Sequence, residues 1–383
     1  MNVYLDNAAT AGLSDSMKKY LISVLDTDGN PSSLHSKGIK AKRLVAEARR
    51  SAAKFINADP HDIYFTCGGA AANTLAVRGY CLKHRCTVLY SPVSHKSVLK
   101  CAESCKDAYP LKVNHEGFID LQDLEERLAA CDTAPFVVID HASSELGTIQ
   151  NVKAITKLAK SYNGTVYLDC TGSIPQLPVD VKALNTDMLG FSAHKLGGLK
   201  GCGILYIKKD ITLEPLIYGS QEQGLVGGTE NVLGIASAGK AAEAYNYSFI
   251  SSIQSSMSSA SLSGRDYVYN YIAKNIPGAY LVGASIGSGN RLPLNLYMCF
   301  KGVEGESLML LLDMNGIQVS TGSACDSRSM AASPALSAIG MNKRDIHSCI
   351  RMTFSGRETK QELDYVCEKL KSCVEDLREL STL

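Results

Sequence analysis

Short apolar runs alternate with longer amphipathic stretches between residues 60 and 210. The runs rich in β-branched and aromatic residues lie at 63–66, 87–91, 136–140, 165–169, 188–192 and 204–207. Helical patterns of about 10 to 20 residues separate most of them, which is typical of crossover connections between parallel strands. We therefore expect an α/β fold whose mostly parallel central sheet is flanked by helices and collects ligands at the carboxyl ends of its strands.

The pattern changes in the last third of the chain. β-like runs lie at 294–300, 316–320 and 350–354, and helical patterns lie at 305–312 and 360–380. This mixture predicts a smaller α+β domain.

The chain is long enough for two domains. It has 383 residues, of which 45% are hydrophobic and 20% charged, so each domain can bury a core. We place a large domain at 13–250 and form a small domain from 1–12 and 251–383. The serine-rich stretch 241–264 could be a flexible linker, but its apolar residues recur near helical spacing and favour a polar-faced helix between the domains.

Charge and cysteine usage limit the classes of ligand and partner that the protein can bind. The net charge is +1, so no basic surface for nucleic acid or anionic membrane is expected, and small molecules or proteins are the expected partners. The start of the chain has no basic stretch before an apolar one, and no run approaches the ~20 apolar residues that span a bilayer, so we expect a cytoplasmic protein. The 13 cysteines lack CxxC spacing, and neither a disulfide framework nor a metal site is expected.

Polar residues gather where the predicted strands end. Such residues are found at 67–69, 94–95, 141–145 and 192–195 and at Asp169. Because carboxyl ends of parallel strands share one edge of a sheet, these residues outline a cleft. Lys195 and Asp169 indicate its chemistry: a lysine can hold pyridoxal phosphate through its aldehyde, and a strand-end carboxylate keeps the pyridine nitrogen protonated.

Further candidates surround this pair, each with a simpler alternative. Gly69 and Ala70 open a helix whose N–H groups can bind a phosphate, although glycines at such a turn are usually only geometry. Ser192 and His194 can reach the same phosphate. His95 can lie over the cofactor ring or act only as a helix cap.

Three residues of the cleft have further alternatives. Asp169 can instead cap the turn that follows it. Thr229 either caps the next helix or donates to a phosphate. Lys195, once released from the cofactor by substrate, can shuttle a proton.

Two residues in the last third of the chain suggest what the cofactor is used for. Cys325 stands among small residues in a stretch poor in apolar bulk, which favours an accessible, reactive thiol over a core residue. Arg351 lies inside an apolar strand-like run, where a charge needs a partner. A substrate α-carboxylate would satisfy it, and so would an internal salt bridge.

Taken in order, these residues resemble the cysteine desulfurases, the NifS/IscS-type branch of the class V aminotransferases. The resemblance runs through nearly the whole chain and rests on residues 4–10, 29–33, 94–96, 145–147, 192–195, 228–229, 304–307 and 323–325, together with His35, Asp169 and Arg351. It implies a fold type I homodimer that binds pyridoxal 5′-phosphate. Thr229 would serve the partner subunit's phosphate site.

The resemblance also implies a division of labour. Lys195 would carry the cofactor, His95 would stack on its ring and move protons, and Asp169 would pair with its nitrogen. Gly69, Ala70, Ser144, Ser192, His194 and Thr229 would complete the cofactor site. Arg351 and Asn30 would bind L-cysteine. Cys325 would take its sulfur as a persulfide, release alanine and pass the sulfur to an acceptor or scaffold protein, as in iron–sulfur cluster assembly.

Several family positions differ in this chain. Ala70 and Ala71 stand where relatives have threonine and glutamate, and Val226 stands in place of an arginine. Ser144 and Gly172 replace an asparagine and a glutamine that bind the cofactor's phenolic oxygen. Loss of these donors is expected to alter the pKa of the lysine–cofactor linkage.

Two other functions stay open. One is a selenocysteine lyase or another class V lyase or aminotransferase, which a substrate panel scored by alanine would separate. The other is a degenerate homologue that binds cofactor weakly and acts as a sulfur-transfer partner. The changed positions favour that reading, and retention of Lys195, Asp169, His95, Cys325 and Arg351 opposes it.

Overall fold

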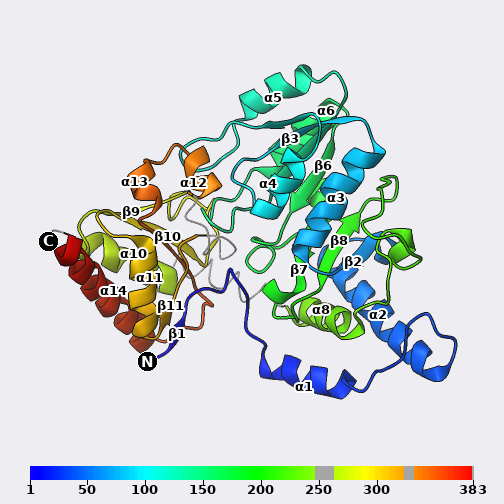
Figure 1. The fold of residues 1–383 in the computed structure, drawn as a ribbon, viewed down its shortest axis with the longest axis horizontal. Coiled ribbons are helices and arrows are strands. Elements are labelled where there is room, and N and C mark those ends of the chain that lie inside the picture. Colours follow the sequence, from blue (N-terminus) through cyan, green and yellow to red (C-terminus); the bar gives the residue numbers. More distant parts are fainter. Residues whose placement is uncertain (246–262, 323–331, 382–383) are drawn as a thin grey trace.

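The structure is a computed structural model that describes residues 1–245, 263–322 and 332–381. Two groups of strands dominate it, and Figure 1 shows them side by side, with the larger group among cyan, blue and green helices and the smaller one beside the yellow-to-red helices. None of the helices in these three ranges is long and apolar enough to cross a bilayer.

A seven-stranded sheet forms the larger group. Its strands are β2 (Ile63–Thr66), β3 (Cys86–Tyr90), β4 (Ala108–Pro110), β5 (Ala134–Asp140), β6 (Thr165–Asp169), β7 (Met188–Ser192) and β8 (Gly203–Ile207). They are ordered β2-β8-β7-β6-β5-β3-β4, and β8 alone among them runs against its neighbours. The carboxyl ends of β2, β3, β5, β6 and β7 therefore share one edge.

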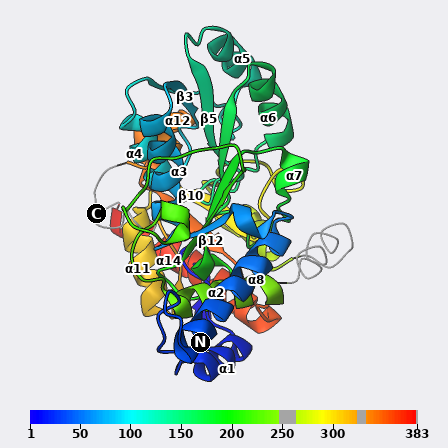
Figure 2. The same ribbon diagram turned by 90° about the vertical axis from the view of Figure 1, so that its right-hand side faces the viewer.

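Helices cover both faces because the strands are apolar on both sides. Phe136 and Val138 of β5 pack with residues of α3 and α4, whereas Val137 and Ile139 pack with residues of α2, α5 and α6. This period of two is what a strand imposes on successive side chains. Figure 2, turned by 90°, shows α3 and α4 on one side of the strands and α6 and α7 on the other.

The helices associated with this sheet are α1 (Asp15–Val24), α2 (Ser36–Phe55), α3 (Gly69–Lys83), α4 (Lys96–Glu103), α5 (Leu121–Ala129), α6 (Val152–Ser161), α7 (Val181–Leu184) and α8 (Val232–Ala244). Short 3-10 turns are η1 (Pro60–Asp62), η2 (Ala193–Lys195) and η3 (Glu222–Gly224). Most of the helices have a side-chain N-cap, such as Asp120 before α5, whose carboxylate accepts from Gln122 N at 2.9 Å. The cap of α3 is Gly68, which has no side chain to offer.

The smaller group contains two small sheets and the ends of the chain. Antiparallel strands β9 (Ala279–Leu281), β10 (Asn295–Phe300) and β12 (Cys349–Thr353) form one sheet, and β1 (Val3–Tyr4) pairs with β11 (Ile317–Gln318) in the other. The accompanying helices are α10 (Gly264–Asn275), α11 (Gly305–Met314), α12 (Pro334–Ala338), α13 (Lys343–Ile346) and α14 (Lys360–Ser381). Val3 and Leu5 join the core built by α10, α11 and α14.

The fold predicted from the sequence is confirmed. All six predicted strands of the large sheet are present, with bounds within two residues of those expected. The pattern missed β1, β4 and β9, which have two or three residues each and are too short to show a period. The division at residues 12 and 250 remains a prediction, and most of the serine-rich stretch lies outside the described residues.

Candidate functional site

Lys195 lies at the carboxyl edge of the seven-stranded sheet. Strand β7 ends at Ser192, and the η2 turn then carries Lys195 over that edge. The Lys195 ammonium donates to the backbone carbonyls of Ala8 and Ala9, the second at 2.9 Å. A cavity of about 610 Å³ opens here, lined among others by Asn7, Lys195 and Gly172. The N-terminal segment thus closes one wall of the site.

Asp169 ends the neighbouring strand β6, opposite Gly190 of β7. It is only 3% exposed, and each carboxylate oxygen has a donor: Oδ1 accepts from Thr171 N at 2.8 Å and Oδ2 from Asn73 Nδ2 at 3.0 Å. Asn73 Oδ1 in turn accepts from the Tyr167 hydroxyl. The carboxylate is thus held rigidly. Its bond from Thr171 N also means that Asp169 caps the turn after β6, which was the alternative role predicted for it.

Gly69 and Ser192, two of the residues predicted to bind phosphate, meet at the start of α3. Gly68 has a φ of +145°, nothing lies within 4 Å of where its Cβ would be, and α3 begins without a side-chain cap. A Cβ on Gly69 would lie 3.2 Å from Ser192 Cβ and 3.4 Å from Thr171 Oγ1. Because Thr171 Oγ1 is buried with no hydrogen-bond partner among the described residues, this corner offers a hydroxyl and open helix N–H groups to an anion.

The two candidate histidines have defined partners. His95 is the N-cap of α4: its Nδ1 accepts from Ser97 N at 3.2 Å and lies 2.7 Å from Ser97 Oγ. The simpler alternative for His95, a helix cap, is therefore present. His194 Nδ1 lies 3.2 Å from Thr10 Oγ1. Burial, followed by the charges of Lys195 and Lys200, lowers the pKa of His194 to about 4, so it is neutral at physiological pH.

A second acid and a third histidine lie next to Asp169 at the end of β5. Asp140 pairs with Asp169 across β5 and β6. Burial, and next the Asp169 carboxylate, raise the pKa of Asp140 well above its usual range. Burial lowers the pKa of His141 to about 4. Asp140 Oδ1 and His141 Nδ1 are buried and have no hydrogen-bond partner among the described residues.

Two positions that differ from the family pattern lie against each other. A Cβ on Gly172 would come within 2.9 Å of Ser144 Cβ and 3.1 Å of Ser144 N. Only glycine fits at position 172 while the loop carrying Ser144 packs this closely. The two positions are therefore sterically coupled, and Ser144 is half-buried beside Gly172.

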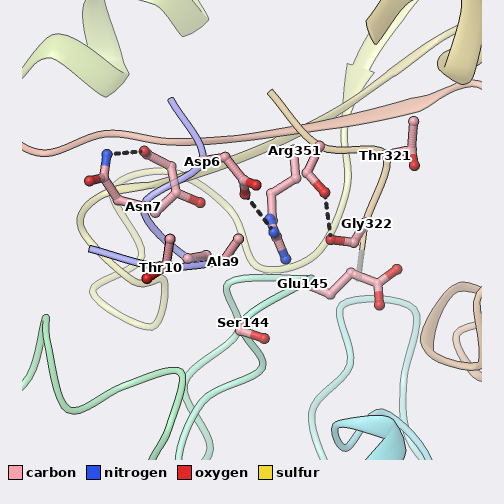
Figure 3. A network of polar contacts seen from close by, with 12 residues as sticks. Asp6, Asn7, Ala9, Thr10, Ser144, Glu145, Thr321, Gly322 and Arg351 are labelled. Atoms are coloured by element: carbon pink, nitrogen blue, oxygen red, sulfur yellow. Dashed lines mark hydrogen bonds and ion pairs between the residues drawn. The ribbon is translucent and has the colours of Figure 1, made fainter. Parts of the chain in front are cut away.

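Arg351 approaches from the smaller sheet. It is 3% exposed on β12, and its Nη2 donates to Asp6 Oδ1 at 2.9 Å, as Figure 3 shows. Its Nε is buried and has no hydrogen-bond partner among the described residues. The predicted alternative of an internal salt bridge is thus present, while part of the guanidinium fork still lacks an acceptor. Asp6 had no role assigned from the sequence, although it lies in the motif at 4–10.

Other predicted residues are not brought to the cavity. Asn30 and Thr229 are exposed and lie together, with Asn30 Nδ2 3.5 Å from Thr229 Oγ1. The alternative of Thr229 as a helix cap is wrong, because Asn231 caps α8 by accepting from Gly234 N at 3.0 Å. Cys325 lies outside the described residues. Within the described ranges, no group of three or more His, Cys, Asp or Glu side chains is placed to hold a metal ion.

The sequence missed Asn73, whose side chain orients Asp169. The sequence signal was weak: Asn73 stands among the small and apolar residues of 69–77, where an amide would need a buried partner. In the structure Asn73 is 2% exposed. Sequence spacing could not say that this partner lies 96 positions away.

The residues at this edge fit pyridoxal phosphate. An amine, a buried carboxylate with fixed donors, and an uncapped helix start beside two hydroxyls match the aldehyde, ring nitrogen and phosphate of that molecule. The unpartnered Thr171 Oγ1 also fits, since a native buried hydroxyl normally has an acceptor or donor.

Comparisons with known proteins agree with this geometry. The family model described as aminotransferase class-V matches residues 3–366. A cysteine desulfurase IscS from Dictyoglomus turgidum is 38% identical over 99% of this chain and 96% of its own length. Cysteine desulfurase IscS 1 from Archaeoglobus fulgidus is 35% identical over 99% of both chains.

Solved structures give the same result. A NifS-like protein superposes with a TM-score of 0.88 at 29% identity, covering 98% of this chain and 100% of its own. SspA in complex with cysteine superposes with a TM-score of 0.78 at 27% identity, covering 94% of this chain and 100% of its own.

Proposed function

Because the chain belongs to the aminotransferase class-V family, we propose that it is a pyridoxal phosphate-dependent cysteine desulfurase. It converts L-cysteine to L-alanine and transfers the sulfur to Cys325. The proposal agrees with the relatives named cysteine desulfurase and with the neighbouring structure that contains cysteine.

One observation carries the proposal: Lys195 and Asp169 follow adjacent strands at the same sheet edge. Asp169 lies opposite Gly190 of β7, and Lys195 follows five residues later on the same chain segment. The Asp169 carboxylate is bound to Thr171, which lines the same cavity as Lys195. The cofactor requires a reactive amine on the cavity and a fixed buried acid behind its wall, and Lys195 and Asp169 are placed in this way.

The chemistry divides between the cofactor and the chain. Pyridoxal phosphate, when bound, withdraws electrons from the α-carbon of the substrate. Asp169 would keep a positive charge on the ring nitrogen, and Lys195 would hold the aldehyde and, once released, would accept and return protons. The start of α3, with Ser192 and Thr171, binds the phosphate. Neutral His194 can donate its one N–H there without adding charge.

Arg351 binds the substrate carboxylate in this proposal. Its Nη2 is already paired with Asp6, so the ion pair fixes the guanidinium plane, and Nε remains to donate. A bound carboxylate would thus be oriented before reaction, which fixes where the substrate sulfur lies.

Cys325 completes the reaction as the sulfur acceptor. Its thiolate attacks the sulfur of bound cysteine, the carbon–sulfur bond breaks, and a sulfur–sulfur bond forms. The carbon fragment keeps the electron pair, gains a proton and leaves as alanine, so cysteine and one enzyme thiol give alanine and one enzyme persulfide. A protein of iron–sulfur cluster assembly would then remove the outer sulfur. We also propose a homodimer, since exposed Thr229 and Asn30 would complete the partner's site.

The decisive experiment tests cofactor binding and sulfur acceptance by Cys325 independently of each other. Purified protein is expected to show a visible absorbance band and to release alanine from cysteine. Cys325→Ala should keep the band, lose persulfide detected by mass spectrometry, and slow alanine release by at least about 100-fold. Cys131→Ala, which removes a half-buried thiol just after α5 and away from the cavity, is the matched control and should behave like the unsubstituted protein.

Two results would overturn the proposal. One is a persulfide that forms at the unsubstituted rate in Cys325→Ala. The other is a kcat/KM for selenocysteine that exceeds the value for cysteine by more than about 100-fold, which would assign the chain to a selenocysteine lyase.

A further inference from the structure

A buried carboxylate touches both described flanks of the segment that carries Cys325. Glu145 follows β5 and is 9% exposed. Its Oε1 accepts from Ser333 Oγ at 2.5 Å and from the Tyr297 hydroxyl at 3.1 Å. A Cβ on Gly322 would lie 3.1 Å from the same Oε1 and 3.2 Å from the Tyr297 hydroxyl. Residues 322 and 333 are therefore neighbours in space at this one oxygen.

Tyr297 connects this carboxylate to the chain just before residue 322. The Tyr297 side chain is fully buried on β10, and its hydroxyl oxygen also lies 3.4 Å from Thr321 O. Burial, followed by the charge of Glu145, raises the pKa of Tyr297 well above its usual range, so the hydroxyl keeps its proton and can donate. On this side the chain is tied further by Ser320, whose N donates to Arg351 O at 3.1 Å.

The carboxylate itself is held in place through its backbone. Asn295 Nδ2, on β10, donates to Glu145 O at 3.2 Å and to Ser144 O at 3.3 Å. Arg291 Nη2 donates to Asn295 Oδ1 at 2.8 Å, and Arg291 is 5% exposed. Figure 3 shows Glu145 and Gly322 close together beside Arg351. The loop after β5 and strand β10 thus form one rigid support.

We propose that Glu145 is a positioning residue for sulfur transfer, which with Tyr297 fixes both ends of the segment 323–331. The proposal rests on the proposed role of Cys325. A thiol on a tether with fixed ends has a higher effective concentration at the substrate than one whose ends can separate. Removing the shared acceptor should therefore slow the attack on sulfur and leave binding of cysteine to Arg351 nearly unchanged.

The test first makes the contact between Ser333 and Glu145 repulsive and then restores a hydrogen bond between the two positions. Ser333 also caps α12 by accepting from Leu336 N at 3.3 Å, and aspartate caps helices equally well. Ser333→Asp therefore keeps the cap but sets a carboxylate against Glu145. In the double variant Glu145→Gln with Ser333→Asp, the introduced amide can donate to the introduced carboxylate. Glu145→Ala removes the acceptor without adding charge and serves if Ser333→Asp fails to fold.

Two measurements are made on the full-length protein with bound pyridoxal phosphate. The first is the rate of tryptic cleavage after Arg328, identified by the masses of the two fragments, which needs no enzymatic activity. Ser333→Asp and Glu145→Ala should raise it about tenfold. The second is alanine release: kcat should fall about tenfold while KM for cysteine stays within about threefold. The double variant should return within about threefold of the unsubstituted protein in both measurements.

Glu116→Gln is the matched control, because Glu116 is another loop carboxylate that accepts from a serine, Ser285 Oγ at 2.9 Å. It should change neither measurement. The inference is overturned if Ser333→Asp and Glu145→Ala are cleaved and turn over as the unsubstituted protein does, or if the double variant is no better than Ser333→Asp. If the unsubstituted protein releases no alanine, the proposed function fails, while the cleavage rates still decide whether Glu145 anchors the two flanks.

Discussion

Buried polar groups at the carboxyl edge of the seven-stranded sheet are satisfied less completely than two buried arginines of the smaller region, Arg265 and Arg291. At the edge, buried atoms such as Asp140 Oδ1, His141 Nδ1 and Thr171 Oγ1 have no hydrogen-bond partner among the described residues. In the smaller region, Arg265 pairs with Asp266 at 2.6 Å, and Arg291 donates to the carbonyls of Val282 and Ala284 at 2.8 and 2.6 Å.

This difference separates polar groups used for packing from polar groups kept for a ligand. An unsatisfied buried group costs about 1–3 kcal/mol, so several on one sheet edge indicate that a ligand completes them. Arg351 is informative because it belongs to the smaller sheet yet keeps Nε unpartnered, and its ion pair with Asp6 lies next to Asn7, which lines the cavity with Lys195. The comparison therefore assigns Arg351 to the ligand and Arg265 and Arg291 to the fold.

The strongest test removes the amine from the edge. Lys195→Ala should lower alanine release by at least about 1000-fold and abolish the visible band, because Lys195 is the one lysine among the described residues that line the cavity. Lys200→Ala, an exposed lysine five positions away, should keep both. An equal loss of alanine release in the two variants would show that Lys195 is not the residue that holds the cofactor.

Acid should destabilise the cofactor-free protein through His141. The pKa of His141 is lowered to about 4 by burial from an ordinary value of 6.5. Between these values the unfolded chain binds a proton that the folded protein does not. The stabilisation is therefore complete above pH 6.5 and is lost as the pH falls towards 4, by about 3 kcal/mol.

Urea unfolding of the unsubstituted protein and of His141→Gln, at pH 7 and pH 4, measures this loss. The difference in unfolding free energy between the two proteins should change by about 3 kcal/mol across that range. His115→Gln, which alters an exposed histidine, should follow the unsubstituted protein at both values. Parallel pH profiles for His141→Gln and the unsubstituted protein would contradict the assignment.

Arg351 should matter for substrate binding and not for folding. Arg351→Lys keeps a cation for Asp6 but loses the planar fork, so KM for cysteine should rise about 30-fold with a smaller change in kcat. Arg49→Lys alters a comparable fork, which donates to Glu222 at 2.8 and 2.6 Å away from the cavity. Arg49→Lys should leave KM unchanged. A similar KM in both variants would show that Arg351 serves packing and not substrate binding.

Asn73→Ala should give the smallest effect, on cofactor affinity. It removes one donor from Asp169 and the acceptor of Tyr167, so the pyridoxal phosphate dissociation constant should rise about tenfold in a spectral titration. Asn151→Ala removes the cap of α6, a similar local bond elsewhere, and should lower the melting temperature without changing that constant. Unchanged affinity in Asn73→Ala would show that the Thr171 N–H is enough to orient Asp169.

Local pattern was enough for the large sheet because its strands are apolar on both faces and separated by helical stretches. The ends of these strands carried Asp169, Ser192 and Lys195, and their gathering at one edge follows from parallel pairing alone. The small sheets were harder. Strand β1 has two residues, and its pairing with β11 depends on a contact more than 300 positions away.

The sequence by itself determined the class of fold and the gathering of Asp169, Ser192 and Lys195 at one sheet edge, because these depend on short periods and on parallel strand pairing. Tertiary structure alone decided which polar side chains pair: Asp6 with Arg351, Asn73 with Asp169, and Glu145 with Ser333. These partners lie 345, 96 and 188 positions apart. No local pattern encodes such pairs, since the energy that selects them appears only when the two regions pack and exclude water.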